Sequence, residues 1–129
     1  MKVEIKTTED IITSRSVAKE MAKEMGFGIV DQTKIATAIS ELTRNIILYA
    51  GQGRVDIKAI AAANRKGLEI ICEDQGPGIA DINLAMQDGF STSKGLGMGL
   101  PGAKRPMDEF DLQAERGKGT KVTARKWLF

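Results

Sequence analysis

The sequence contains no histidine and only one cysteine among its 129 residues. The absence of histidine excludes a histidine general base, a histidine phospho-acceptor and a histidine-ligated metal. A single cysteine can neither form a disulfide within the chain nor complete a structural zinc site. Cys72 lies inside an apolar run, where we expect a small buried strand residue and not a reactive thiol. Any chemistry of this chain therefore depends on other groups.

Aromatic residues and excess charge are also scarce. Aromatics make up 5% of the chain, and 19 basic against 17 acidic residues leave a formal charge of +2. Neither value favours nucleic-acid binding. No apolar run approaches the roughly 20 residues that span a bilayer, and the alternating start, Met1–Ile5, does not resemble a signal sequence. We expect one domain over residues 1–129, cytoplasmic, with no nucleic-acid or membrane partner.

Glycine is abundant in one part of the chain. Half of the 14 glycines fall between Gly76 and Gly102, and five of these seven lie in the clusters Asp74–Gly78 and Gly95–Gly99. Glycine lets other groups approach the backbone closely, and successive N–H groups ahead of a helix form an anion cradle. A G-x-G-x-G run alone is weak evidence, because it also serves as a hinge. It is no P-loop, since Lys94 precedes the glycines.

Hydrophobic periodicity predicts the order β-α-α-β-β-loop-α-β-β. The expected strands are residues 2–7, 54–63, 68–73, 110–115 and 120–128, with turns at 64–67 and 116–119. The expected helices are residues 8–25, 31–49 and 98–107. This order favours a sheet of mostly antiparallel strands with helices on one face.

Two acidic residues and one amide are candidates for chemistry. Glu41 and Asn45 are four residues apart on a predicted helix and so share a face. They are either ordinary polar positions at the border of that helix or a carboxylate and an amide oxygen that face a ligand, the amide being a hard ligand suited to Mg²⁺. Asp74 follows a strand, where it is either an Asx-turn residue or an acceptor for a purine amino group.

The joint order of these pieces is more specific than any one of them. Along the chain come E-x-x-x-N on a helix (Glu41 to Asn45), a hairpin, D-x-G-x-G from Asp74, a long loop, G-x-G-x-G at Gly95–Gly99 and G-x-G-T ending at Thr120. The pattern resembles the GHKL (Bergerat) ATP-binding superfamily. Within it, Ser40–Asn45 and Gly95–Gly102 are most similar to the small serine/threonine kinases of partner-switching pathways, the stressosome switch kinases of the RsbT type.

The resemblance implies an α+β fold, a two-layer α/β sandwich with a mostly antiparallel mixed sheet and helices on one face. It also implies ATP and Mg²⁺ as cofactors. Asn45 would ligate Mg²⁺. Asp74 would hold the adenine amino group with the help of Thr120 and a water. Glu41 would orient and deprotonate the attacking hydroxyl.

The glycines would surround the nucleotide in the same comparison. Gly76 and Gly78 would let the backbone approach it, and residues 79–97 would form an ATP lid. The phosphates would lie against the run Gly95, Leu96, Gly97, Met98 and Gly99. Lys94 is a candidate for a γ-phosphate contact, with a solvated surface lysine as the alternative.

The implied function is an ATP-dependent protein serine/threonine kinase. Its substrates would be STAS-domain antagonist and scaffold proteins of a bacterial stress pathway, and the released kinase would activate a PP2C-type phosphatase. Two alternatives remain open: an anti-sigma kinase whose main output is sigma-factor binding, and a non-catalytic nucleotide-gated binding module. The step from an ATP site to a substrate is analogy.

Overall fold

The computed structural model describes residues 1–76, 100–114, 117 and 119–128. The elements are β1 (Lys2–Ile5), α1 (Thr8–Met25), α2 (Ile29–Asn45), the π-helix η1 (Ile46–Ala50), β2 (Gly53–Ala62), β3 (Arg65–Asp74), α4 (Leu100–Lys104), β4 (Glu109–Ala114) and β5 (Thr120–Leu128). This succession confirms the predicted order of helices and strands. Within the described ranges, no helix is both long and apolar enough to cross a bilayer.

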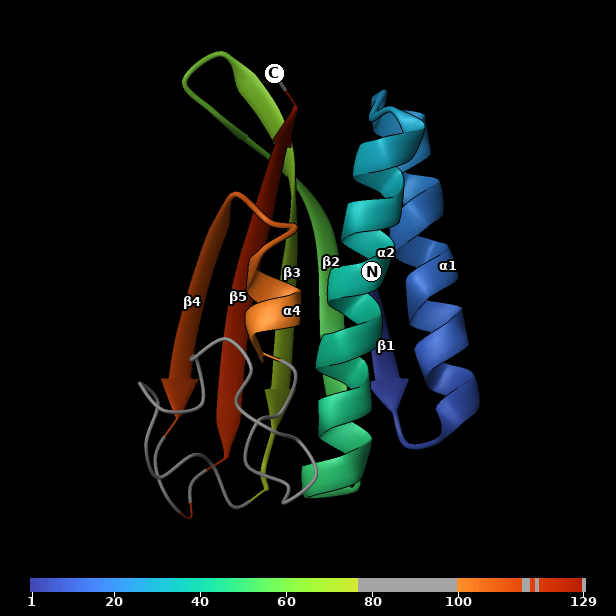
Figure 1. Cartoon of the computed structure of the whole chain (residues 1–129), viewed down its shortest axis with the longest axis vertical. Helices are drawn as coiled ribbons and strands as arrows, with labels where there is room; N and C mark the ends of the chain where they lie inside the picture. Colours follow the sequence, from blue (N-terminus) through green and yellow to red (C-terminus); the bar gives the residue numbers. More distant parts are fainter. Residues whose placement is uncertain (77–99, 115–116, 118, 129) are drawn as a thin grey trace.

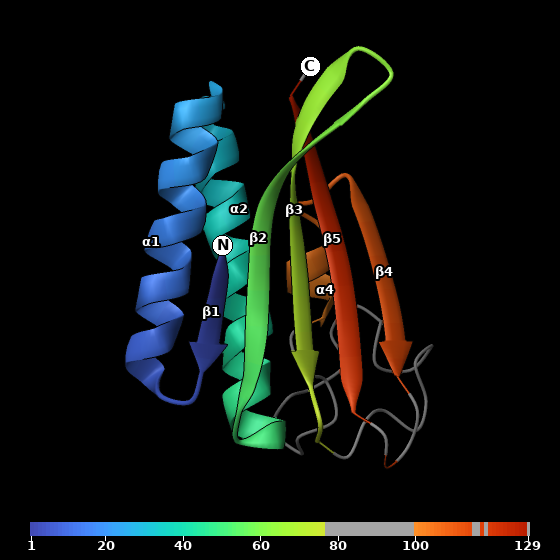
Figure 2. The same cartoon turned by 180° about the vertical axis from the view of Figure 1, so that it is seen from behind.

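The five strands form one sheet in the order β1-β2-β3-β5-β4, and each of the four neighbouring pairs is antiparallel. Figure 1 shows α1, α2 and α4 packed on one face of this sheet. Figure 2, seen from behind, shows the strands in front of the helices. The predicted two-layer arrangement with antiparallel strands and helices on one face is therefore confirmed.

The core lies between the helices and the sheet. Because side chains alternate along a strand, every second residue of β3 faces the helices. The buried core residues of β3 and α2 include Leu68, Ile70, Cys72, Ile35, Ile39 and Leu42. Burial raises the pKa of the Cys72 thiol. This agrees with the expectation of a buried strand cysteine that is not reactive.

Helix α1 begins and ends with local signals. The carboxylate of Asp10 accepts hydrogen bonds from the backbone N–H groups of Lys6 and Thr7, at 2.8 and 2.9 Å. These bonds lower the pKa of Asp10 and satisfy donors that an N-terminal turn leaves unpaired. Gly26 ends the helix in the left-handed conformation, with φ +101°, as a C-terminal glycine commonly does.

The helix predicted over residues 31–49 differs at both ends. It begins at Ile29 and stays α-helical only to Asn45, after which η1 continues with wider π-helical turns. A π-helical segment is rare and is frequently found at functional sites. Here it ends at Gly51, whose φ is +85°, and it lies against the ends of β2 and β3.

The predicted turn at 64–67 is wrong. The hairpin turns at Ala63 and Asn64, which both have positive φ, and Arg65 already pairs with Ala62. Positive φ at two central residues is the requirement of the tight type I′ turn, which matches the twist of the strands. Gly67 therefore lies inside β3 and not in the turn.

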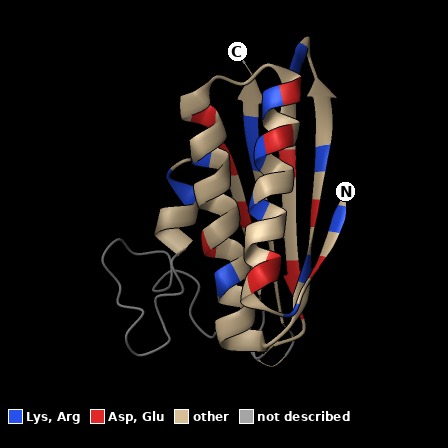
Figure 3. Cartoon of the chain, turned by 90° about the vertical axis from the view of Figure 1, so that its right-hand side faces the viewer, with Lys and Arg blue, Asp and Glu red and all other residues tan. Residues whose placement is uncertain are grey.

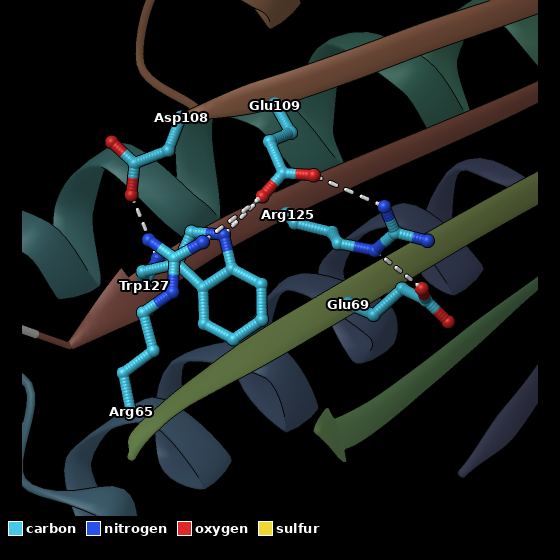
Figure 4. Close-up of polar contacts among 6 residues, drawn as sticks. All are labelled: Arg65, Glu69, Asp108, Glu109, Arg125 and Trp127. Atoms are coloured by element: carbon cyan, nitrogen blue, oxygen red, sulfur yellow. Dashed lines mark hydrogen bonds and ion pairs between the residues drawn. The ribbon is translucent and has the colours of Figure 1, made fainter. Parts of the chain in front are cut away.

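The face of the sheet away from the helices carries a polar network (Figure 4). The guanidinium of Arg125 lies 2.7 Å from Glu69 and 3.1 Å from Glu109. The indole N–H of Trp127 also donates to Glu109, and the Arg65 guanidinium stacks 4.0 Å from the Trp127 ring centroid. This network joins β3, β4 and β5, and so it supports the register of β5, whose first residue lies in the candidate site.

Candidate functional site

The C-terminal end of α2 packs directly on the ends of β2 and β3, at the lower end of the sheet in Figure 1. A Cβ at Gly53 would lie 2.8 Å from Ile46 and 3.1 Å from the Cβ of Asp74. A Cβ at Gly76 would lie 2.6 Å from the Cβ of Ala50. Real Cβ atoms do not come this close to other carbons, so both positions require glycine. These contacts bring η1 against Asp74.

Asn45 is the last residue of α2 and immediately precedes η1. Its side-chain amide nitrogen is buried and has no hydrogen-bond partner within the described part of the chain. Buried polar side-chain atoms nearly always have partners, so we expect this nitrogen to meet a group that the described residues do not supply. Rotation of the amide exchanges its oxygen and nitrogen, so the same position can present either atom. The site therefore fits a group that coordinates or hydrogen-bonds this amide.

Asp74 ends β3 and lies opposite Thr120, the first residue of β5. It is half-buried, and burial raises the pKa of its carboxyl, while the backbone N–H groups of Gly76 and Thr120 act in the opposite direction. The Gly76 N–H bond to Oδ1 measures 2.9 Å. A Cβ on Gly119 would overlap the carbonyl oxygen of Asp74. Asp74 is thus a partly desolvated acceptor whose surroundings leave no room for added side chains.

Glu41 lies one helical turn before Asn45, on the same face of α2. Its side chain is 32% exposed, and its carboxylate lies 3.2 Å from the guanidinium of Arg44. A Cβ on Gly102 of α4 would lie 4.0 Å from the Glu41 Cγ. Glu41 therefore lies where α2 approaches α4, partly accessible to solvent and paired with Arg44.

A sequence-family model described as histidine kinase-, DNA gyrase B- and HSP90-like ATPase matches residues 30–128. The chain belongs to this ATPase family. Its match covers both α2, with Glu41 and Asn45, and the strands that carry Asp74 and Thr120. The predicted GHKL membership is confirmed, and with it the expectation of ATP binding.

Relatives within the family are protein kinases and anti-sigma factors. The chain is 59% identical to "Serine/threonine-protein kinase RsbT" of Bacillus subtilis (strain 168) over 126 residues, which cover 98% of this chain and 95% of that protein. It is 34% identical over 121 residues to "Anti-sigma F factor" of Thermoanaerobacter sp. (strain X514), covering 89% and 83%. The first relationship places the chain among the serine/threonine protein kinases of the family, as expected.

Solved structures support the fold. The solved structure "Mycobacterial sensor histidine kinase MprB" matches with a TM-score of 0.60 and 18% identity, covering 98% of this chain and 96% of that one. The catalytic domain of histidine kinase ThkA matches with a TM-score of 0.54 and 17% identity, covering 98% and 95%. At these identities the likeness concerns the fold alone.

Part of the predicted ATPase site lies outside the described residues. This applies to Gly78, to Lys94, to the predicted lid over residues 79–97 and to the phosphate run Gly95, Leu96, Gly97, Met98 and Gly99. The described part brings Asn45, Asp74 and Thr120 to one end of the sheet. Their roles toward a nucleotide, and that of Gly76, remain predictions.

The sequence did not reveal the close packing at two glycines of this ATPase fold, Gly53 and Gly119. The sequence suggested no role for Gly53, and it placed Gly119 in the predicted turn at 116–119 and in the G-x-G-T motif without a packing role. Both prove to be places where neighbouring backbone or side chains come too close for a Cβ. For Gly53 the reason is its register opposite Asp74 in the β2–β3 pair, which no local sequence pattern reveals.

Proposed function

We propose that this chain is an ATP- and Mg²⁺-dependent protein serine/threonine kinase of a partner-switching pathway. The observation that carries the proposal is the buried side-chain nitrogen of Asn45, which has no hydrogen-bond partner among the described residues and lies one turn from Glu41, at the same end of the sheet as Asp74. A ligand at this end would satisfy that amide and meet both carboxylates. The relationship to a named serine/threonine kinase at 59% identity supports the same reading.

Asp74 and Asn45 would bind different parts of the nucleotide–metal complex. Asp74 would accept a hydrogen bond from the adenine amino group, because its carboxyl is half-buried and lies beside Gly76 and Gly119, where the close packing leaves no room for larger side chains. Asn45 would hold Mg²⁺ through its amide oxygen, a hard ligand of the kind this ion takes. When bound, ATP supplies the phosphoryl group and Mg²⁺ neutralises part of its charge.

Glu41 would take the proton of the acceptor hydroxyl. The hydroxyl oxygen bonds the γ-phosphorus, ADP leaves with the bridging oxygen, and the proton passes to the carboxylate. Phosphoryl transfer passes through a loose transition state, so positioning matters more than a strongly basic group. A partly exposed carboxylate meets this need, because a protein substrate can reach it from solvent.

On the partner side, we propose STAS-domain antagonist and scaffold proteins as substrates and a PP2C-type phosphatase as the target of the free kinase. The second candidate is a sigma-factor-binding anti-sigma kinase, which the 34% identity to an anti-sigma F factor favours. A non-catalytic nucleotide-gated module is a third candidate, but it gives no reason for Glu41 to stand beside Asn45.

The decisive experiment incubates the purified chain with labelled ATP, Mg²⁺ and a panel of STAS-domain proteins and sigma factors. We expect label on serine or threonine of a STAS protein, and co-elution of a sigma factor without label would favour the second candidate. Glu41→Gln should bind ATP normally in calorimetry but transfer phosphate about 100- to 10,000-fold more slowly, which is the range for loss of a general base.

Glu24→Gln, on an exposed position of α1, serves as the matched control and should keep full activity. Transfer by Glu41→Gln at the wild-type rate would remove Glu41 from the mechanism. A wild-type chain that binds no adenine nucleotide at saturating Mg²⁺ would refute the proposed function as a whole.

A further inference from the structure

Gly102 is the third residue of the short helix α4, Leu100–Lys104. A glycine inside a helix lowers stability, because it loses more backbone freedom on folding than any other residue. The other described glycines each have a structural reason, which is a positive φ, a neighbour too close for a Cβ, or a cap position. Gly102 has none of these reasons, so the backbone does not explain it.

The surroundings of Gly102 leave room for a side chain. Its φ is not positive, and among the described residues outside its own segment a Cβ would meet only the Cγ of Glu41, at 4.0 Å. This is an ordinary contact distance, so an alanine would fit without strain. Gly102 is also partly exposed, and so solvent can reach the position where a side chain would lie.

Helix α2 lies between α1 and α4. Figure 1 shows α4 beside α2 on the side away from α1, and Figure 3 shows α1 and α2 next to each other. Glu41 of α2 is the proposed base, and the contact at 4.0 Å makes position 102 its neighbour from α4. A side chain at this position would therefore lie against the base.

The Glu41 carboxylate has one oxygen in use and one free. Oε1 accepts a hydrogen bond from Arg44 at 3.2 Å, whereas within the described part of the chain no donor meets Oε2. A base must come within about 2.6–3.2 Å of the hydroxyl that it deprotonates. The guanidinium of Arg44 already occupies space beside the carboxylate, so the approach of a hydroxyl depends on which other neighbours of Glu41 are small.

We propose that position 102 carries no side chain so that the acceptor serine or threonine of the protein substrate can reach Glu41 between α2 and α4. Gly102 is in this sense a specificity-determining residue, because it leaves the space that the incoming hydroxyl side chain needs. The identity of the incoming group rests on the proposed kinase function. The open approach to Glu41 does not depend on that function.

The kinetic test measures single-turnover transfer from labelled ATP to the STAS-domain protein that accepts label. We expect Gly102→Ala to slow transfer about tenfold and Gly102→Leu about 100-fold, the loss caused by displacing reacting groups by about 1 Å, with ATP affinity unchanged. Gly28→Ala is the matched control, because a Cβ there has no neighbour within 4 Å and Gly28 caps the opposite end of α2. It should transfer phosphate at the wild-type rate.

The stability of Gly102→Ala should change in the opposite direction. Alanine favours a helix more than glycine does, so this variant should raise the folding equilibrium constant by up to about fivefold in urea unfolding. A glycine needed for packing would instead make the variant both less stable and slower. Higher stability together with slower transfer therefore identifies a position kept open for function.

A chemical test of access does not require kinase activity. A water-soluble carbodiimide couples glycinamide to accessible carboxylates, and peptide mass spectrometry measures the rate at Glu41 in the chain without nucleotide. We expect Gly102→Leu to slow this coupling several-fold. Coupling at Glu24, on an exposed position of α1, is the internal control and should not change.

Four results would overturn the inference. These are transfer by Gly102→Leu at the wild-type rate, a loss of ATP affinity that accounts for the slower transfer, lower stability of Gly102→Ala, and unchanged coupling at Glu41 in Gly102→Leu. Circular dichroism checks the fold of each variant, and Gly102→Ala decides alone if the leucine variant does not fold. If the wild type labels no protein while Gly102→Leu still protects Glu41, the kinase function is refuted and the open approach to Glu41 stands.

Discussion

Replacing Gly119 by alanine should destabilise the protein more than the same change at Gly117. Both glycines lie in the β4–β5 turn with positive φ, +87° and +81°. A Cβ on Gly117 meets nothing within 4 Å, whereas one on Gly119 overlaps the backbone carbonyl oxygen of Asp74. The pair therefore separates the cost of the backbone conformation from the cost of the close approach.

The magnitudes follow from these two contributions. An alanine at positive φ costs about 1–2 kcal/mol, partly offset by about 0.4–1 kcal/mol from the less flexible unfolded chain. Gly117→Ala should therefore lose about 1 kcal/mol of unfolding free energy. Gly119→Ala adds about 1–3 kcal/mol for overpacking against a backbone that cannot rotate away.

Urea unfolding followed by circular dichroism measures both values, provided the m-values of the two variants agree. Gly119→Ala should also weaken ATP binding in calorimetry, because relief of the overlap moves Asp74 or Thr120, while Gly117→Ala should not. Equal stability losses for the two variants would refute the argument that the backbone of β5 approaches Asp74 this closely.

Three further changes test other contacts. Burial raises the pKa of Asp74 above its usual 3.8, so nucleotide affinity should fall as acid protonates this acceptor. Calorimetry from about pH 7 to about pH 4 should show this fall in the wild type and not in Asp74→Asn. The same shift means that ionisation of Asp74 opposes folding, so its contribution to stability decreases as the pH rises through the raised pKa. Asn45→Asp should lower the Mg²⁺ concentration needed for ATP binding several-fold, since a carboxylate is the stronger hard ligand, and an unchanged metal titration would contradict the role of Asn45. Lys126→Met removes an ammonium group that lies 3.3 Å from Asp108 and should lower the free energy of unfolding in urea by about 1–2 kcal/mol. The same change at exposed Lys121 on the same strand should cost little. Equal losses of stability in the two variants would show that the ion pair is not stabilising.

The helical part of the site could be predicted because its signals are local. The apolar stripe of α2 repeats every three to four residues, so Glu41 and Asn45 fall on one face whatever the helix packs against. Asp74 was placed correctly at the end of a strand, because alternation stops where the glycines begin. These predictions needed only the order of residues along the chain.

The predicted element boundaries were wrong where contacts between distant segments decide the local structure. Gly67 suggested a turn, but it lies within β3, where a Cβ would approach the Trp127 ring to 2.7 Å. The glycine makes room for an indole that lies 60 positions later in the chain. Likewise, α2 was predicted to remain α-helical beyond Asn45, whereas the contact between Ile46 and Gly53 accompanies the change to η1.

The amino-acid sequence by itself determined the elements, their order and the amphipathic faces, because propensity and periodicity act over a few residues. It also indicated the family, because the order of motifs along the chain can be read without knowing how they pack. Only the tertiary structure decided which strand lies beside which, that the Asn45 amide nitrogen is buried with no partner in the described part of the chain, and that Arg15, Lys19, Glu41 and Arg44 line one groove between α1 and α2. These features depend on distances between segments remote in the chain. Such distances are set by packing the whole core at once, and no local pattern encodes them.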